Sequence, residues 1–213
     1  MQSGADRPGF DEEHGMLARG YRSVAGVDEA GRGAWAGPVT AAAVVFETSA
    51  SMLHALAGVN DSKKLSALQR EVLRARIEAT ASAWAVGMSS SAEIDALGIV
   101  PATRLAMTRA IFGLRIAPES LLIDAVKLPA LALAQKSFPF ADSISLSVAA
   151  ASILAKTARD DVMRGLHVQE SGYGFDEHKG YGTALHRRML AALGASPHHR
   201  FSFRPLRALA QTA

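Results

Sequence analysis

Val-Ala-Gly-Val-Asp-Glu-Ala-Gly-Arg-Gly, residues 24–33, is the stretch from which the rest of the chain can be interpreted. Its first half is apolar and bounded by glycine, which is typical of a short buried strand. Asp28 and Glu29 end this strand, and two adjacent carboxylates are costly to desolvate there unless a cation compensates them. We therefore expect a divalent metal ion at the end of the strand.

The turn after the strand has a composition suited to binding a phosphate. Gly31 and Gly33 lack a side chain, so the backbone can come close to a ligand. Arg32 lies between them and can hold a phosphate through two parallel hydrogen bonds. Metal and phosphate chemistry are thus predicted within one decapeptide.

The composition indicates one globular unit. The chain has 213 residues, 49 % of them hydrophobic, so we expect an N-terminal arm over residues 1–20 and a single domain over residues 21–213. No apolar stretch has membrane-spanning length, and residues 1–7 lack the features of a secretory signal, which predicts a cytoplasmic protein with no membrane partner. The absence of cysteine excludes thiolate chemistry, so any metal must be bound by oxygen or imidazole.

Charge is unevenly distributed along the chain. The formal net charge is +3, but residues 151–213 hold nine Lys and Arg against five Asp and Glu, whereas residues 1–150 hold 14 against 15. A basic C-terminal third is compatible with a surface that faces nucleic acid. A difference of this size also arises by chance, so the motifs must support the assignment.

Hydrophobic periodicity and capping residues predict strands followed by helices. After the first strand, the predicted strands are residues 38–46, which pair antiparallel with it, 84–88 and 120–126. The predicted helices are residues 66–81 with a capping box, a stretch broken near Gly98 and Pro101, residues 146–170, and a final helix between Thr183 and Gly194. Residues 1–20 are expected to form a loose arm or a short helix. This order predicts an α/β fold, a mixed sheet flanked by helices with the active site at one edge.

Two further carboxylates are expected beside the first pair. Within the stretch at residues 120–126, Asp124 closes the buried strand formed by Leu121, Leu122 and Ile123. Asp142 precedes the long helix, whose start is expected near the same sheet edge. Together with Asp28 and Glu29, they would repel one another strongly without cations. Oxygen-only ligation selects hard ions such as Mg²⁺ or Mn²⁺. The pattern therefore predicts phosphodiester hydrolysis at a two-metal site.

Ordinary structural roles compete with these assignments. The acids at residues 28–29 could be a turn residue beside a solvated side chain. Asp124 could serve as a turn or cap, and Asp142 could cap the long helix. Asp160 and Asp161 lie deep in a predicted helix, where ion pairs along the helix explain them, so they are left out of the site.

The remaining polar candidates also have two interpretations. Tyr181 lies between two glycines, which favours a contact role over that of a buried aromatic. Lys63 and Lys64 are either phosphate contacts or a solvated pair before a helix. The seven histidines show no clear zinc-ligand spacing, so packing or substrate-facing roles are expected for them.

These candidates lie in five ordered motifs that resemble those of the ribonuclease HII family, the type 2 ribonucleases H. The motifs are Asp28-Glu29-Ala30-Gly31-Arg32-Gly33 with Ala36-Gly37-Pro38-Val39, Asn60-Asp61-Ser62-Lys63-Lys64-Leu65, Ile123-Asp124, Ala149-Ala150-Ala151-Ser152-Ile153-Leu154-Ala155-Lys156 and His178-Lys179-Gly180-Tyr181-Gly182-Thr183. The resemblance covers about residues 21–205.

The resemblance implies a ribonuclease H-like fold, in which a mixed five-stranded sheet is flanked by helices and followed by a C-terminal helical extension. It implies an endoribonuclease that hydrolyses the RNA strand of RNA/DNA hybrids and cuts 5′ to ribonucleotides embedded in duplex DNA. Two divalent ions, Mn²⁺ or Mg²⁺, would act with substrate bound, and the products would carry 5′-phosphate and 3′-hydroxyl ends. A monomer is expected.

The resemblance also implies a role for each matching residue. The metal ligands would be the four carboxylates Asp28, Glu29, Asp124 and Asp142. The ribose 2′-hydroxyl at the cleavage junction, which distinguishes RNA from DNA, would be read by Gly31, Arg32 and Gly33. Tyr181 would stack on the neighbouring deoxyribose. Backbone phosphates would be contacted by Ser62, Lys63 and Lys64.

Three alanines depart from the family pattern. Ala34 stands where proline is frequent, and Ala125 and Ala141 stand beside Asp124 and Asp142 where glycine is usual. Because alanine disfavours positive φ, a difference in local backbone is expected at those two acids.

Two other functions compete with that of an endoribonuclease. A non-catalytic nucleic-acid-binding module could share the fold, but loss of catalysis should free at least one carboxylate to vary, and all four are present. A metal-dependent DNA nuclease on a related fold would not need residues that read ribose. A substrate with all-deoxy strands would decide between this alternative and a ribonuclease.

Overall fold

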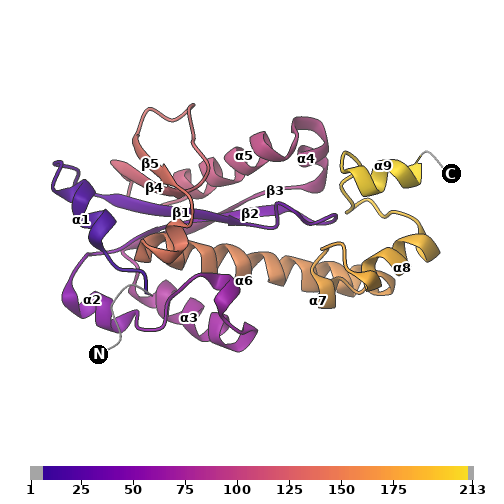
Figure 1. Ribbon diagram of the computed structural model, residues 1–213, viewed down its shortest axis with the longest axis horizontal. Helices are drawn as coiled ribbons and strands as arrows, with labels where there is room; N and C mark the ends of the chain where they lie inside the picture. The colour runs from indigo at the N-terminus through magenta and orange to yellow at the C-terminus, as the bar shows by residue number, and fades with distance from the viewer. Residues whose placement is uncertain (1–6, 211–213) are drawn as a thin grey trace.

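The computed structural model describes residues 7–210, with side chains through residue 207. It contains a mixed sheet of five strands in the order β3-β2-β1-β4-β5 (Figure 1). The strands are β1 (Val24–Ala30), β2 (Val39–Val45), β3 (Ala83–Ser89), β4 (Ser120–Asp124) and β5 (Ala134–Phe138). The predicted α/β class and five-stranded sheet are confirmed.

The pairing of β1 places the candidate acids at one edge of the sheet. β1 and β2 form the predicted antiparallel hairpin, with Asp28 opposite Ala42. On its other side β1 pairs with β4 in parallel, with Val27 opposite Ile123. Because parallel strands end on the same side, the carboxyl ends of β1 and β4 lie together.

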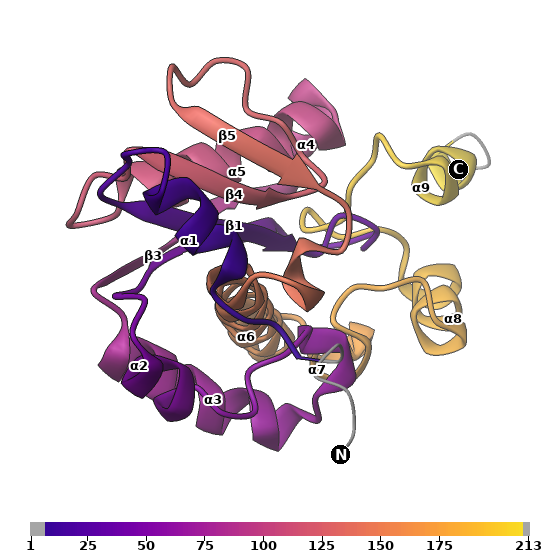
Figure 2. The same cartoon turned by 60° about the vertical axis from the view of Figure 1, so that its left-hand side comes forward.

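Helices cover both faces of this sheet (Figure 2). α6 (Leu146–Gln169) packs on one face against β1 and β2, and α5 (Ile99–Phe112) packs on the other. Each face has its own cluster of buried apolar side chains. Gly26 of β1 permits the close approach of α6, because a Cβ there would lie 2.4 Å from Ser147 Oγ.

The other helices are shorter. They are α1 (Asp11–Leu17), α2 (Ala50–Ala55), α3 (Ala67–Thr80), α4 (Ser91–Leu97), α7 (Phe175–His178), α8 (Ala184–Leu193) and α9 (Arg204–Ala210), with 3-10 turns η1 (Ser62–Lys64), η2 (Ala141–Ser143) and η3 (Ser171–Tyr173). The predicted capping box starts α3. Gly98 separates α4 from α5 as predicted, and Pro101 fits in the first turn of α5. Within residues 7–210, none of the helices is long and apolar enough to cross a bilayer.

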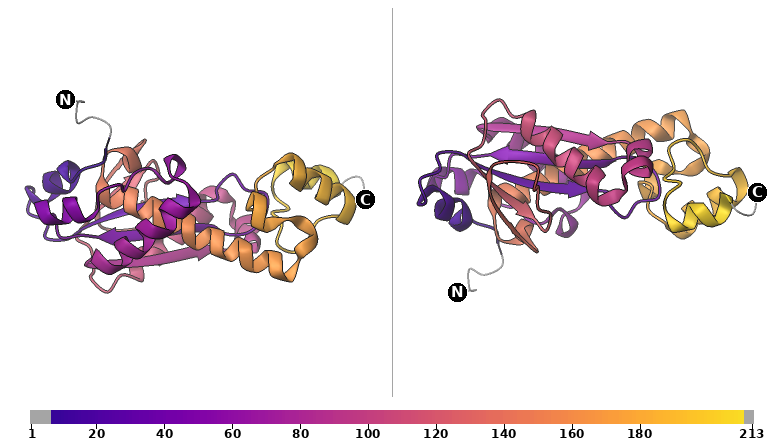
Figure 3. Two further views of the ribbon diagram at one scale, coloured as in Figure 1. Left: turned by 90° about the horizontal axis from the view of Figure 1, so that it is seen from below. Right: turned by 90° about the horizontal axis from the view of Figure 1, so that it is seen from above.

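The C-terminal extension is formed by η3, α7, α8 and α9, and it lies at one end of the molecule (Figure 3). It contacts the loop at residues 31–38 that joins β1 to β2. The Trp35 N–H donates to the Gly180 carbonyl at 2.8 Å, and the Gly37 N–H donates to the His198 carbonyl at 2.9 Å. The prediction that α8 is the final helix is wrong, because α9 follows it.

The N-terminal residues form a docked helix rather than a loose arm. Glu13 of α1 is buried, and its Oε1 accepts hydrogen bonds from Ser145 Oγ at 2.6 Å and from the Ser147 N–H at 2.9 Å. Of the two expectations for this segment, the short helix is therefore the one observed. Residues 1–6 lie outside the described part of the chain, and the domain boundary at residue 20 stays a prediction.

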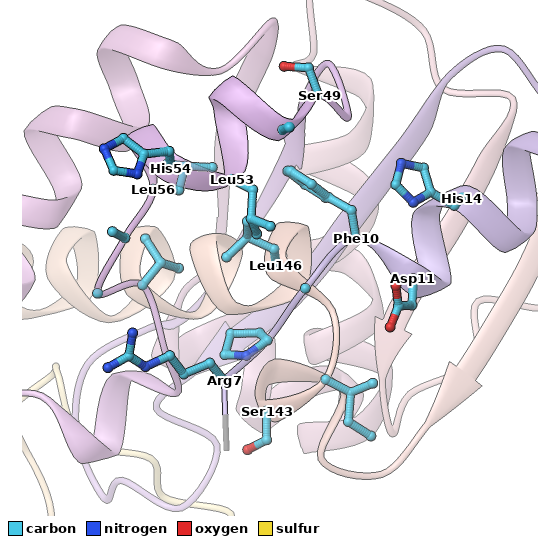
Figure 4. A pocket seen from close by; sticks show the side chains of 17 residues that line it. Arg7, Phe10, Asp11, His14, Ser49, Leu53, His54, Leu56, Ser143 and Leu146 are labelled. Atoms are coloured by element: carbon cyan, nitrogen blue, oxygen red, sulfur yellow. The ribbon is translucent and has the colours of Figure 1, made fainter. Parts of the chain in front are cut away.

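An open pocket of about 900 Å³ lies between the N-terminal segment, α2 and η2 (Figure 4). Its lining includes the side chains of Phe10, Leu56 and Leu146, which belong to the apolar cluster on the α6 face of the sheet. None of the four candidate metal ligands lines this pocket. The predicted chemistry therefore lies elsewhere, at the ends of β1 and β4.

Candidate active site

Asp28 lies among the other candidate ligands and is only 4 % exposed. Burial raises the pKa of Asp28 well above its usual value, and the charges of Glu29 and Asp124 raise this pKa further. The Glu29 N–H donates to Asp28 Oδ1 at 2.7 Å, which partly opposes the shift. The raised pKa means that the surrounding protein groups do not fully stabilise the charged Asp28 carboxylate, so a bound cation is needed to compensate it.

Glu29 has one oxygen paired and one free. Its Oε1 accepts a hydrogen bond from Arg32 Nη1 at 3.2 Å. Its Oε2 is buried and has no hydrogen-bond partner within residues 7–210. Burial raises the pKa of Glu29 although Arg32 opposes the shift. A buried carboxylate oxygen without a partner is a candidate position for a ligand atom or ion.

Asp124 connects the end of β4 to η2. Its Oδ1 accepts the N–H of Ala141 at 2.8 Å. The next residue, Ala125, adopts a positive φ of 51°, so alanine here takes the left-handed conformation that glycine adopts more easily. Ala141, the alanine beside Asp142, does not adopt a positive φ. The residue before it, Phe140, does so instead, with a φ of 59°.

Asp142 is buried in η2, four residues before α6 begins at Leu146. The cap of α6 is Ser145, whose side chain accepts the Val148 N–H, so Asp142 is not the helix cap. Lys63 Nζ lies 3.9 Å from Asp142 Oδ2. Burial raises the pKa of Asp142 to about 6, and nearby Asp61 adds to the shift.

Asp61 is the acidic neighbour that the sequence interpretation missed. Lys63 Nζ lies 3.9 Å from Asp61 Oδ1, so one lysine faces both Asp61 and Asp142. The Asp61 side chain also accepts the Lys63 N–H at 2.9 Å as the cap of η1. Its place in the Asn60-Asp61-Ser62-Lys63-Lys64 motif was the available signal.

The donor set fits hard divalent ions held jointly with substrate. Within residues 7–210, no three His, Asp or Glu side chains already surround a single point as a complete metal cage. Mg²⁺ and related ions are commonly held by one or two carboxylates together with waters and substrate phosphates, which does not require such a cage. The unpaired Oε2 of Glu29 and the repulsion among the buried acids are consistent with this kind of incomplete site.

The loop at residues 31–33 projects next to these acids. Gly31 is buried with a φ of 91°, whereas Arg32 and Gly33 are exposed. Tyr181 is half-buried on the neighbouring extension, where Arg159 and Lys156 lie 5.3 and 5.9 Å from its ring centre. The predicted loop and tyrosine are therefore carried by two segments that contact each other.

The three residues of the η1 turn have different surroundings. Lys63 is 81 % exposed at the side chain, and Lys64 is also exposed. Ser62 is buried, and its Oγ accepts a hydrogen bond from Ser152 Oγ at 2.8 Å. The lysines are free to meet a phosphate, while the Ser62 side chain attaches the turn to α6.

The two aspartates left out of the site form ion pairs on α6. Asp160 pairs with Lys156 at 2.6 Å and with Arg70 at 3.8 Å. Asp161 pairs with Arg74 at 2.6 Å and also with Arg164. These contacts agree with the predicted structural role for both residues.

Buried histidines pack in the C-terminal extension, and their partners assign the tautomers. The Ser196 N–H donates to His199 Nδ1 at 2.9 Å, so the His199 proton lies on Nε2, which contacts His186 Nε2 at 2.9 Å. His186 then donates its Nδ1 proton to the Tyr181 carbonyl at 3.1 Å. These neutral histidines hold the backbone of Tyr181 in place.

Comparison with known proteins identifies the family. The sequence profile of ribonuclease HII matches residues 25–206. The chain belongs to the ribonuclease HII family. Ribonuclease HII of Herpetosiphon aurantiacus is 51 % identical over 203 residues, covering 94 % of this chain and 97 % of that protein. Ribonuclease HII of Roseiflexus castenholzii is 50 % identical over 200 residues, covering 93 % and 89 %.

Solved structures of this class share the fold. Ribonuclease H2 from Pyrococcus horikoshii OT3 has a TM-score of 0.76 at 26 % identity, covering 89 % of this chain and 98 % of that one. Ribonuclease HII in its complex with PCNA from Archaeoglobus fulgidus has a TM-score of 0.72 at 28 % identity, covering 85 % and 95 %. Bst-RNase HIII, solved with Mn²⁺, has a TM-score of 0.66 at 22 % identity, covering 90 % and 70 %, and shows the fold alone.

Three predictions are thereby confirmed. The chain is a member of the predicted family, it has the ribonuclease H-like fold, and it is a metal-dependent ribonuclease of a family that acts on RNA/DNA hybrids. The alternative of a non-catalytic binding module is not supported. The roles of individual residues, the identity of the ions and the position of the cut stay predictions.

Proposed function

We propose that this protein hydrolyses the RNA strand of RNA/DNA hybrids and cuts 5′ to single ribonucleotides embedded in duplex DNA. The observation that supports the proposal is the contact between the exposed loop and the buried acids, where Arg32 Nη1 lies 3.2 Å from Glu29 Oε1. A loop that reads a 2′-hydroxyl there would recognise ribose beside the bond to be cut. The products would carry 5′-phosphate and 3′-hydroxyl ends.

The four carboxylates Asp28, Glu29, Asp124 and Asp142 are proposed to hold two divalent ions, Mn²⁺ or Mg²⁺, when substrate is bound. Bound ions of this kind supply an activated water and neutralise charge on the leaving oxygen. Asp28 and Asp124 would provide the fixed positions, since they lie at the ends of adjacent strands. Glu29 has the unpaired oxygen and is the acid in contact with the proposed ribose-reading loop.

The substrate would lie across the loop, the η1 turn and the extension. Arg32, Lys63 and Lys64 are exposed cations that can contact phosphates from this side. Tyr181 would stack on the deoxyribose next to the ribonucleotide. The side chain of Ser62 is turned inward, so a phosphate contact from this residue would come from its backbone.

The test is cleavage of an end-labelled DNA duplex that contains one ribonucleotide, with and without Mg²⁺ or Mn²⁺. Metal-dependent cutting on the 5′ side of the ribonucleotide is expected, with no cutting of the matched all-DNA duplex. Equal cutting of both duplexes would support a DNA nuclease instead and overturn the role of residues 31–33. A duplex that is bound but stays intact in either metal would overturn the proposed reaction.

The protein is also proposed to act as a monomer in the cytoplasm. Light scattering during size-exclusion chromatography, with and without the ribonucleotide-containing duplex, should give the mass of one chain and of a one-to-one complex. A mass of two chains in the free protein would contradict the monomer.

A further inference from the structure

Two arginines that the proposed chemistry does not use are fully buried beneath the loop. Arg159 of α6 and Arg200 of the extension both have an exposed fraction of 0 %. The five hydrogen bonds recorded for their guanidinium groups within the described residues all go to backbone carbonyl oxygens. Burying a charge is costly, so such an arrangement calls for a role.

Arg200 orients the peptide between Arg32 and Gly33. Its Nη1 donates to the Arg32 carbonyl at 2.9 Å, and its Nε donates to the Gly37 carbonyl at 3.0 Å. In a planar trans peptide the carbonyl and the following N–H point in opposite directions. Because the Arg32 carbonyl faces the buried guanidinium, the Gly33 N–H must face away from it.

The Gly33 N–H is available to a ligand. Gly33 is exposed, and its N–H has no hydrogen-bond partner within residues 7–210. An outward backbone N–H on the exposed loop is a donor that a ribose 2′-hydroxyl can accept from, whereas a deoxyribose offers no oxygen there.

Arg159 joins this loop to the segment that carries Tyr181. Its Nε donates to the Pro38 carbonyl at 2.9 Å, its Nη2 to the Ala36 carbonyl at 3.0 Å and its Nη1 to the Lys179 carbonyl at 2.9 Å. The same guanidinium lies 5.3 Å from the centre of the Tyr181 ring. The three hydrogen bonds therefore set the distance between loop and tyrosine.

Gly31 shows how closely Arg159 supports the loop. A Cβ at Gly31 would lie 1.9 Å from Arg159 Nε, and Gly31 has a φ of 91°. Only glycine fits that conformation without displacing the arginine. The first glycine of the loop is thus explained by the buried arginine, and not only by approach to a substrate.

We infer that Arg159 and Arg200 are positioning residues for ribose recognition: Arg200 turns the Gly33 N–H toward the substrate, and Arg159 holds Tyr181 at a fixed distance from it. This inference rests on the proposed function, because it assumes that the loop reads a 2′-hydroxyl. Neither arginine touches the reacting atoms, so each acts through the backbone it holds.

The decisive measurement is a binding ratio that does not depend on turnover. The affinity for a duplex with one ribonucleotide is divided by that for the matched all-DNA duplex, with Ca²⁺ replacing the catalytic ion. Arg200→Lys keeps the charge but loses the two-pronged donor geometry. We expect it to lower this ratio roughly 10-fold, the effect of losing about one well-placed hydrogen bond. Arg159→Lys should lower the ratio less and weaken binding of both duplexes.

Arg115→Lys is the matched control. The Nε of Arg115 also donates to a backbone carbonyl, that of Ser82, at 2.7 Å. It lies at the opposite end of the sheet, because Ala83 pairs with Val45 whereas the loop precedes Val39. This variant should keep the binding ratio of the original protein.

A second measurement does not depend on any variant. The amide resonance of Gly33 in the unmodified protein should shift more with the ribonucleotide duplex than with the all-DNA duplex. Equal shifts would overturn the inference even if Arg200→Lys failed to fold. In a folded Arg200→Lys protein the difference between the two shifts should disappear.

The two proposals fail in distinguishable ways. If the unmodified protein shows no preference for the ribonucleotide duplex, the proposed function falls and this inference with it. If the preference exists and a folded Arg200→Lys protein retains it in full, the positioning role is wrong and the proposed function stands.

Discussion

Two regions on either side of the loop at residues 31–38 bury charge in opposite ways. On the sheet side, the pKa values of Asp28, Glu29 and Asp142 are all raised, chiefly by burial. On the extension side, Arg159 and Arg200 are fully buried, and five hydrogen bonds from their guanidinium groups go to backbone carbonyls, while Arg200 Nη2 has no partner within residues 7–210.

The difference lies in how much of the charge the protein itself compensates. The acids face one exposed lysine at 3.9 Å and one arginine at 3.2 Å, so mutual repulsion remains. The arginines donate to four oriented carbonyl groups of the loop and to the Lys179 carbonyl, which compensate most of their charge. The acidic region therefore depends on a bound cation for compensation, as proposed above. The basic region is compensated largely by the protein itself, although Arg200 Nη2 is buried without a hydrogen-bond partner within residues 7–210.

The largest expected effect is on the acidic side. Asp124→Asn should lower metal-dependent cleavage by about 10³-fold or more, because one of the two proposed ions would lose a charged ligand. It should also raise the melting temperature of the metal-free protein, since repulsion with Asp28 is relieved. Cleavage assays and thermal unfolding measure the two effects. Asp161→Asn, which alters a surface ion pair, should change neither, and a fall in metal-free stability for Asp124→Asn would contradict the comparison.

On the basic side the main effect should be on stability. Arg159→Met leaves one buried and two half-buried carbonyl groups without donors, and we expect a loss of about 4 kcal/mol in the free energy of unfolding. Urea unfolding with an unchanged slope would measure it. Arg164→Met on the same helix removes only exposed ion pairs and should cost about 0.5 kcal/mol or less. Equal losses in the two variants would show that Arg159 does not support the loop.

Acidic pH should destabilise the C-terminal extension, because His186 is buried there. Burial lowers the pKa of His186 to about 4, against about 6.5 in the unfolded chain, so between these values the unfolded state binds more protons. This contribution is present above pH 6.5 and is lost as the pH falls toward 4, by about 3 kcal/mol. His186→Asn should flatten the stability profile over that range, while the exposed His54→Asn should not. A profile unchanged by His186→Asn would contradict this assignment.

The smallest expected effect concerns the exposed lysine beside the acids. Lys63→Met should weaken duplex binding a few-fold and reduce the slope of log affinity against log salt by about 1, as one phosphate contact is lost. The loss should be equal for ribonucleotide and all-DNA duplexes, because a phosphate contact does not read the sugar. Lys136→Met, which removes a surface pair with Glu12, serves as the control. A sugar-dependent loss would place Lys63 at the ribose instead.

Local signals were sufficient for much of the fold. The start of the apolar run at Val24, the capping box at Ser66 and the helix break at Gly98 all correspond to observed element ends, because each depends on residues adjacent in the chain. β1 itself continues past Asp28 and Glu29 to Ala30. β5 was not identified from its own residues, since Ala-Gln-Lys-Ser-Phe is half-buried and shows no clean alternation. Its strand conformation comes from pairing with β4.

In the candidate site, too, the residues that could be predicted are those with a local sequence signal. The acids of β1 and β4 could be predicted because a carboxylate that ends an apolar strand is visible in the sequence. The proximity of Asp61 to Asp142 and the inward orientation of Ser62 could not be predicted, because both depend on how η1 packs against η2 and α6. The role of Arg159 could not be predicted either, because its full burial follows from how α6 packs against the loop.

The sequence by itself determined the strands that carry the acids, the family and the class of reaction, because these depend on local patterns and ordered motifs. Only the tertiary structure decided that Arg159 and Arg200 point at the loop, that His186 and His199 are neutral, and that the acids remain partly uncompensated. The physical reason is that the cost of a buried charge depends on groups more than 100 residues away, such as the carbonyl of Arg32 beneath the guanidinium of Arg200.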